Sequence, residues 1–416
     1  MKVSRVHIKN FKSIVDLSLD LGPVNIFIGE NGSGKSNILE ALAFAAAAAS
    51  GKLDNEFLVS RGIRVTDPRF MRSAFAETSE GAVSILVENS RRVGVTFEIN
   101  TPRDTPYPKW SAELRMNVPS GLLPLPSIDQ ATKLQSDASF DASLAKNQLE
   151  LADLKAILRS VTNANPPIPL TEELEKIYLT FYKYISLFTS RLYEENSLAD
   201  FIIYSPEISA LRTFEREGQI LPLGIRGEGL LKLLRVLASE DQEGWTALQS
   251  NLGLLDWFSG IEVDHDSSLP EQSIRLRDRF IAAAQPAFDQ RSANEGFLYL
   301  LFFFALIVSK ATPRFFAIEN VDTSLNPKAC SELMRRLAAL ALEHDKQILF
   351  TTHNPSLLDG LNLHDDQQRL FVVFRNKDGH TAARRVMPPK PIGNELPMKL
   401  SEAFTRGLLG GIPQNF

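Results

Sequence analysis

The residues best suited to chemistry form a glycine-rich segment near the start of the chain. They are Gly29, Glu30, Asn31, Gly32, Ser33, Gly34, Lys35 and Ser36. The segment follows an apolar run at residues 24–28 and precedes a helical pattern at residues 37–49. Glycines let backbone N–H groups wrap an anion, a lysine supplies charge to terminal phosphates, and a serine hydroxyl binds Mg²⁺. The order of strand, glycine-rich loop and helix start therefore predicts a site for ATP and Mg²⁺.

A second set of polar residues follows two buried strands late in the chain. An apolar run at residues 313–318 ends in Glu319, and a run at residues 347–352 ends at His353. Helical patterns alternate with these runs, which is typical of a parallel sheet covered on both faces. Because the carboxyl ends of parallel strands meet at one edge, we expect Lys35, Glu319 and His353 to converge on one nucleotide. Glu319 is then placed to hold Mg²⁺ together with Ser36.

The composition excludes several classes of protein. The 416 residues carry 45 Lys and Arg against 50 Asp and Glu, so a net charge of −5 argues against a general nucleic-acid binder. One cysteine excludes an intrachain disulfide framework and fits a reducing compartment. The N-terminus has no apolar signal core, and the longest apolar run, residues 297–308, is too short to span a bilayer. We therefore expect a cytoplasmic protein that makes no use of a membrane.

The pattern of apolar residues predicts three parts. Residues 1–120 form an N-terminal ATPase lobe with the glycine-rich segment and a small antiparallel sheet. Residues 121–200 form a helical insert, for which simple packing and a dimer or partner surface are equally weighted roles. Residues 201–416 form a C-terminal ATPase lobe. Arginines at residues 61–72 and 275–279 are candidate nucleic-acid patches, although solvated surface charge is the simpler interpretation.

These motifs resemble those of ABC-type ATPases of the RecF/SMC/OLD-like group, and in particular the short AAA family ATPases of bacterial anti-phage loci that lack a TOPRIM domain. Residues 8–14 are similar to the start of that family, and residues 29–36 are its Walker A. Residues 318–327 resemble its Walker B and D-loop, residues 351–355 its switch region, and residues 292–296 its signature motif. The resemblance implies an α/β fold: a phosphate-loop ABC-type ATPase head with an antiparallel β subdomain and a helical insert.

The resemblance also implies a head-to-tail dimer. In this arrangement ATP lies between the Walker A of one subunit and the signature segment of the other, where Ser292 and Gly296 would contact it. ATP then links the subunits and its hydrolysis releases them. Within one subunit, Ser292 and Gly296 should therefore lie far from the phosphates. The resemblance makes His353 the switch histidine that contacts the γ-phosphate.

The end of the second strand departs from the family pattern. The family has Asp and then Glu where this chain has Glu319 and Asn320. Glu319 can still hold Mg²⁺, but the Asn320 amide cannot accept a proton as a carboxylate does. Because a general base contributes about 10²–10⁴-fold in rate, we expect slow hydrolysis. Asn320 can still orient a water, and Asp322 is a candidate substitute for the missing base.

Three functions fit these features. The first is a switch that forms a homodimer or higher homo-oligomer and regulates a partner nuclease or toxin, encoded nearby, in anti-phage defence. The second is a DNA-repair ATPase like RecF that acts on DNA ends, and the third is a nucleotide-binding scaffold that never hydrolyses. The residues after His353 are too few for a TOPRIM nuclease domain, and no heptad pattern persists as in an SMC-like tether. Asn320 favours the first and third functions.

Overall fold

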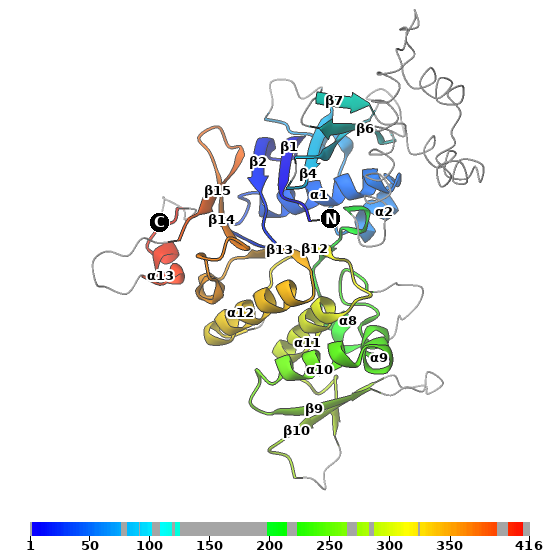
Figure 1. The fold of residues 1–416 in the computed structure, drawn as a ribbon, viewed down its shortest axis with the longest axis vertical. Helices are drawn as coiled ribbons and strands as arrows, with labels where there is room; N and C mark the ends of the chain where they lie inside the picture. Colours follow the sequence, from blue (N-terminus) through cyan, green and yellow to red (C-terminus); the bar gives the residue numbers. More distant parts are fainter. Residues whose placement is uncertain are drawn as a thin grey trace, which may run out of the picture.

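The computed structural model describes most of the chain outside its central segment. The described residues are 2–75, 81–90, 92–101, 109–118, 121–124, 198–213, 223–263, 273–282, 287–322, 325–388 and 398–410. The predicted helical insert at residues 121–200 lies outside them, apart from β7 (Gly121–Pro124) and η1 (Leu198–Asp200). Within the described residues the strands form three sheets, with helices packed around them (Figure 1).

A sheet of six strands forms the centre of the molecule, in the order β15-β14-β3-β13-β12-β8. Its strands are β3 (Val24–Ile28), β8 (Ile203–Tyr204), β12 (Phe315–Ile318), β13 (Gln347–Thr352), β14 (Gln368–Arg375) and β15 (Thr381–Val386). All neighbouring pairs are parallel except β14 with β15. The carboxyl ends of β3, β12 and β13 therefore lie at one edge, which confirms the α/β arrangement predicted from the sequence.

The central parallel strands are buried on both faces. Ile26, Ile348 and Phe350 belong to one hydrophobic core, whereas Phe27 and Leu349 belong to another. The first core contains α9 (Leu230–Glu240), α10 (Gln242–Leu252), α11 (Glu295–Val308) and α12 (Pro327–Glu343), and the second contains α1 (Lys35–Ala49). Since side chains alternate between the two faces of a strand, burial on both sides accounts for the nearly continuous apolar runs.

An antiparallel sheet covers α1 on the side away from the parallel strands (Figure 1). Its order is β2-β1-β4-β5-β6-β7. The bounds not yet given are β1 (Arg5–Phe11), β2 (Ile14–Asp20), β4 (Val83–Glu88), β5 (Gly94–Asn100) and β6 (Ser111–Val118). Ile8, Ile85 and Phe97 of this sheet share a core with α1. The predicted antiparallel subdomain is confirmed, and β7 extends it past residue 120.

The remaining described elements are short. They are α2 (Asn55–Ser60), α3 (Pro68–Met71), α8 (Ile208–Arg212), η2 (Pro355–Gly360), α13 (Leu400–Thr405) and a small sheet of β9 (Phe258–Val263), β10 (Ile274–Asp278) and β11 (Phe288–Asp289). On this small sheet Arg277 pairs with Glu262 at 2.5 Å, and Arg279 pairs with Asp256 at 3.3 Å. These acidic neighbours favour solvated charge over a nucleic-acid patch at residues 275–279.

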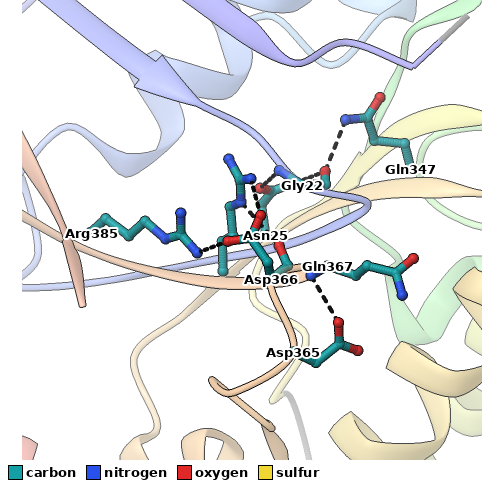
Figure 2. Close-up of polar contacts among 8 residues, drawn as sticks. Gly22, Asn25, Gln347, Asp365, Asp366, Gln367 and Arg385 are labelled. Carbon is teal, nitrogen blue, oxygen red and sulfur yellow. Dashed lines mark hydrogen bonds and ion pairs between the residues drawn. The ribbon is translucent and has the colours of Figure 1, made fainter. Parts of the chain in front are cut away.

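A polar network fixes the amino-end edge of the central sheet (Figure 2). The side-chain oxygen of Gln347 accepts a hydrogen bond from the Val3 N–H at 2.8 Å, and its amide donates to the carbonyls of Val3 at 2.6 Å and Gly22 at 2.9 Å. Asn25 bonds both backbone groups of Gly22, at 2.8 and 2.7 Å. Gln347 is only 3% exposed, so these bonds tie the N-terminal segment and the turn before β3 to β13.

The same edge joins β14 to β15. The Asp366 carboxylate accepts from Arg369 at 2.7 Å and from Arg385 at 2.5 Å. The Gln367 N–H donates to the Asp365 carboxylate at 3.0 Å, whereas the Gln367 side chain points away from the network (Figure 2). This edge therefore contains a buried, hydrogen-bonded glutamine, Gln347, and an exposed glutamine, Gln367.

Replacing the buried Gln347 should destabilise the protein. Gln347→Leu keeps the size of the side chain but leaves the buried polar groups of Val3 and Gly22 without these partners. We expect the free energy of unfolding to fall by about 2–4 kcal/mol, measured by urea denaturation. The control Gln367→Leu, at the exposed position, should change it by less than about 0.5 kcal/mol. Equal losses from the two variants would contradict this account.

Candidate nucleotide site

The glycine-rich loop connects the end of β3 to the start of α1. Gly34 precedes the helix with φ 107°, and no side chain caps the helix N-terminus. The first N–H groups of α1 therefore face the loop without a side-chain acceptor, which is the arrangement that binds anions at helix starts. The start of a helix also carries a partial positive charge from the aligned peptide dipoles. This end of α1 is thus suited to phosphate.

Two glycines of the loop are required by close packing. A Cβ at Gly34 would lie 2.0 Å from Thr381 Oγ1, and one at Gly29 would lie 2.0 Å from the Val373 carbonyl oxygen. By contrast, a Cβ at Gly32 would meet nothing within 4 Å. The loop is therefore packed against β14 and β15 on one side and open at Gly32.

Lys35 is held at the centre of this loop. Its ammonium group donates to the carbonyls of Gly29 at 2.9 Å and Glu30 at 2.8 Å. Burial lowers the pKa of Lys35 to about 8, against the opposing effect of the carboxylates of Glu319, Asp322 and Glu30. A buried ammonium whose partners are two neutral carbonyls fits the terminal phosphates of ATP, which would supply the missing negative charge.

Ser36 connects the loop to the end of β12. Its hydroxyl donates a hydrogen bond to the Glu319 carboxylate, across 283 positions of sequence. A hydroxyl and a carboxylate side by side are the hard oxygen ligands that Mg²⁺ prefers. The two halves of the site predicted from the sequence are therefore in contact, and the donor set fits the metal.

Hydrogen bonds and an unusual backbone conformation fix the chain at Asn320, just after β12. The Glu319 N–H donates to the Tyr204 carbonyl at 2.8 Å, and the Asn320 N–H donates to Thr351 Oγ1 at 3.0 Å. Asn320 has φ 52°, in the left-handed region that Asn and Asp tolerate better than most residues. This conformation gives a structural reason for an asparagine at position 320.

His353 and Asp322 complete the cluster. The Asp322 carboxylate accepts from Thr352 Oγ1 at 2.7 Å, so the end of β13 orients it. His353 follows as an exposed residue. Partial burial and the charge of Lys35 lower the pKa of His353, opposed by Asp322, by a backbone hydrogen bond with Gly29 and by Glu319. The structure thus brings the predicted residues Lys35, Ser36, Glu319, Asp322 and His353 together.

The signature-like segment lies elsewhere. Ser292 is exposed and donates to Asp289 at 3.3 Å, and Gly296 lies in the first turn of α11. The Ser292 N–H donates to the Asp289 carbonyl at 3.2 Å, so the hydrogen bonds of Ser292 stay within its own turn. Helix α11 packs on the face of the central sheet opposite to α1 (Figure 1). The expectation that Ser292 and Gly296 act on a second subunit therefore stays a prediction.

Sequence reasoning missed several residues of this region. Asn294 caps α11, with its side-chain oxygen accepting from the Phe297 N–H at 2.8 Å. Its position just before Glu and an apolar run was the available signal. Thr381 and Arg375 contact the phosphate loop from β15 and β14, and nothing in their local sequence predicted this.

A family model described as "AAA domain, putative AbiEii toxin, Type IV TA system" matches residues 24–359. The chain belongs to this AAA-domain family. The match contains both the phosphate loop and the strand ends that approach it. No described helix is long and apolar enough to cross a membrane, and no cluster of three or more metal-ligating side chains occurs among the described residues.

The AAA domain is also similar to DNA replication and repair proteins RecF. The RecF of Lactococcus lactis subsp. cremoris is 34% identical over 93 residues, which cover 22% of this chain and 25% of that protein. The RecF of Rhodococcus erythropolis is 32% identical over 100 residues, covering 24% and 21%. The chain thus spans about a quarter or less of the length of these relatives. This partial likeness agrees with the resemblance to RecF-like ATPases that the sequence motifs indicated.

Solved structures with a similar course of the chain include two SMC heads. The SMC head domain from Thermotoga maritima has a TM-score of 0.45 at 15% identity, covering 93% of this chain and all of that one. An SMC head bound to the C-winged helix domain of ScpA has a TM-score of 0.47 at 14% identity, covering 93% and 98%.

The buried state of Lys35 predicts a pH dependence for ATP binding. Above about pH 8 the free protein loses the Lys35 proton, while phosphates would hold the bound lysine protonated. The titration of Lys35 should therefore leave ATP affinity unchanged below pH 8. Above pH 8 the affinity should fall, approaching tenfold per pH unit, as measured by calorimetry. In Lys35→Arg the guanidinium stays charged, so any residual affinity should vary little up to pH 9.5. A level profile for the native protein would count against this assignment.

Proposed function

We propose that the protein is an ATP- and Mg²⁺-dependent ATPase that forms a nucleotide-sandwich homodimer and regulates a partner nuclease or toxin in anti-phage defence. The observation that carries the ATP site is the contact between Ser36 and Glu319 beside the buried Lys35. The toxin–antitoxin wording of the family description supports the regulatory part of the proposal. The partner itself would be encoded nearby.

Each residue near the loop has a proposed role. The N–H groups of residues 29–36 and the Lys35 ammonium bind the phosphates, and Ser36 and Glu319 hold Mg²⁺. His353 contacts the γ-phosphate. Asn320 orients the attacking water without accepting its proton, and Asp322 is the carboxylate proposed to accept it instead. Hydrolysis by this set of residues should be slow, which suits a switch whose signal is the ATP-bound state.

The place of the signature segment supports the proposed dimer. Ser292 bonds to Asp289 and Gly296 lies in α11, which packs on the face of the central sheet opposite to α1, whereas the loop is open at Gly32. A second copy turned head to tail would bring its signature segment over this opening. ATP would then be held between two subunits and would stabilise their association.

Similarity to RecF favours a second candidate, a DNA-repair ATPase. The two functions differ in their response to DNA, because a repair ATPase should be stimulated by DNA ends. Steady-state ATPase with and without linear DNA separates them, and strong stimulation would favour repair. A scaffold that never hydrolyses is the third candidate, and it requires that turnover be absent altogether.

Restoring a carboxylate at residue 320 should increase the rate of hydrolysis. Asn320→Asp keeps a residue that tolerates φ 52°, whereas Asn320→Glu restores the family residue at a cost of about 1 kcal/mol in backbone strain. We expect at least one of them to raise kcat by about tenfold or more, since a general base contributes about 10²–10⁴-fold.

The matched control is Asn320→Gln, which lengthens the side chain but keeps the amide. It should leave kcat unchanged or lower it. The account of the missing base is wrong if neither carboxylate variant exceeds the native rate while both still bind ATP.

ATP with Mg²⁺ should drive self-association. Sedimentation at fixed protein concentration should show a shift from monomer to dimer with ATP but a smaller shift with ADP, which lacks the γ-phosphate that the second subunit would contact. Lys35→Ala should remain monomeric under all conditions because it loses the phosphate site. A dimer population that is independent of nucleotide in both proteins would overturn the sandwich.

A further inference from the structure

A chain of hydroxyl groups links the phosphate loop to the β14–β15 hairpin. Thr381, the first residue of β15, is 2% exposed, and its Oγ1 lies 2.9 Å from the Ser33 carbonyl oxygen. The same atom lies 2.7 Å from Ser13 Oγ, which in turn accepts from the Asn37 amide at 2.6 Å. Three segments far apart in sequence therefore meet at one buried threonine.

The direction of these hydrogen bonds follows from chemistry. A carbonyl oxygen can only accept, so the Thr381 hydroxyl must donate to Ser33. Thr381 Oγ1 is then the acceptor for Ser13, whose hydroxyl accepts from the Asn37 amide in turn. The Thr381 N–H also donates to the Ser13 carbonyl at 2.8 Å, which holds the two residues together independently of their hydroxyls. Each hydroxyl thus has one donor and one acceptor role, and the threonine has one favoured rotamer.

The hydrogen bond from Thr381 to the Ser33 carbonyl determines the orientation of the Ser33–Gly34 peptide. In a trans peptide the C=O and the following N–H point in opposite directions. With the Ser33 carbonyl directed at Thr381, the Gly34 N–H must point to the other face of the loop. Lys35 holds the carbonyls of Gly29 and Glu30 on that same loop, and its ammonium group is the charge proposed to meet the phosphates.

The hairpin makes a second contact of the same kind. Arg375, the last residue of β14, donates through Nε to the Gly32 carbonyl at 2.9 Å. Its guanidinium also lies 5.6 Å from the centre of the Phe75 ring, which restricts its movement. Two successive carbonyls of the loop, at Gly32 and Ser33, are therefore turned toward the hairpin.

We propose that Thr381 is a positioning residue for phosphate binding, whose hydroxyl turns the Ser33–Gly34 peptide so that its N–H faces the polyphosphate of a nucleoside triphosphate. Ser13 and Asn37 hold the Thr381 hydroxyl in the required orientation. The inference rests on the proposed ATP site and extends it to a residue that approaches the loop from outside. The ligand is recognised through its phosphates, so the base and the ribose play no part in this effect.

The test replaces the hydroxyl while keeping the shape. Thr381→Val is isosteric but cannot donate, whereas Thr381→Ser keeps the donor. Affinities of the full-length protein for MgATP and for inorganic tripolyphosphate are measured by calorimetry. Thr381→Val should weaken both ligands by the same factor, about five- to tenfold, as expected for one hydrogen bond, and Thr381→Ser should restore affinity to within about twofold.

A matched control separates positioning from stability. Thr312 is also fully buried, and its hydroxyl donates to the Leu306 carbonyl at 2.6 Å, in the loop between α11 and β12. Thr312→Val should lower the melting temperature while leaving both affinities unchanged. If Thr381→Val lowers the melting temperature by a similar amount but also weakens the ligands, the loss of affinity is specific to the phosphate loop.

A second variant tests the link to Ser13 and covers the case in which Thr381→Val does not fold. Ser13→Ala should weaken both ligands by about two- to threefold, because Thr381 keeps its donor but loses its orientation. The double variant with Ser13→Ala and Thr381→Val should bind no more weakly than Thr381→Val alone, because Ser13 acts through the Thr381 hydroxyl.

The outcomes distinguish this inference from the ATP site itself. If native protein binds neither ligand, the proposed ATP site fails and the inference fails with it. If native protein binds both and Thr381→Val binds them equally well, only the role of Thr381 is overturned. A loss of ATP affinity without a loss of tripolyphosphate affinity would also overturn it, because the effect would then lie with the base or the ribose.

Discussion

The hydrogen bond from Ser36 to Glu319 is the contact on which the candidate site depends. It joins residues 283 positions apart, and it exists because one strand, β13, separates β3 from β12 in a parallel sheet. Parallel strands release the chain at the same edge, so the loop after β3 and the carboxylate after β12 must emerge as neighbours. The two cores on either side of the sheet hold these strands rigidly, and the polar network at the opposite edge fixes their register. The buried strands of the central sheet thus determine where Ser36 and Glu319 lie.

The phosphate loop is organised before any ligand arrives. The carbonyls of Gly29 and Glu30 face the Lys35 ammonium, and those of Gly32 and Ser33 face Arg375 and Thr381. In a trans peptide the N–H faces away from the carbonyl, so the Gly34 N–H lies on the side opposite to Thr381, whereas the Ser33 N–H donates to the Glu30 carbonyl at 3.3 Å. Binding then needs little rearrangement of the loop, which reduces the cost of ordering. The Lys35 ammonium is a buried charge whose lowered pKa a bound anion would raise again.

Asn320 combines a structural and a chemical constraint. Its left-handed backbone conformation lets the chain turn from β12 toward the cluster around Asp322, and few residues with side chains adopt it readily. The side-chain amide of Asn320 cannot remove a proton from water. Asn320 therefore joins a tight turn of the chain to a side chain that cannot act as a general base, which is the basis of the proposed slow hydrolysis. The family match places this combination within an AAA domain whose members carry the description of a toxin–antitoxin system.

The sequence by itself determined the phosphate loop, the strands that are buried on both faces, the antiparallel subdomain and the candidate residues Lys35, Ser36, Glu319 and His353. Glycine spacing and the period of apolar residues are local properties, so the chain displays them without its fold. Only the tertiary structure decided that Thr381 meets Ser13 and Ser33, across 368 and 348 positions, and that Glu262 and Asp256 offset two arginines of the small sheet. It also showed that Asn294 caps α11. These contacts depend on which strands become neighbours and on how hairpins pack. The local pattern of residue types does not predict either feature.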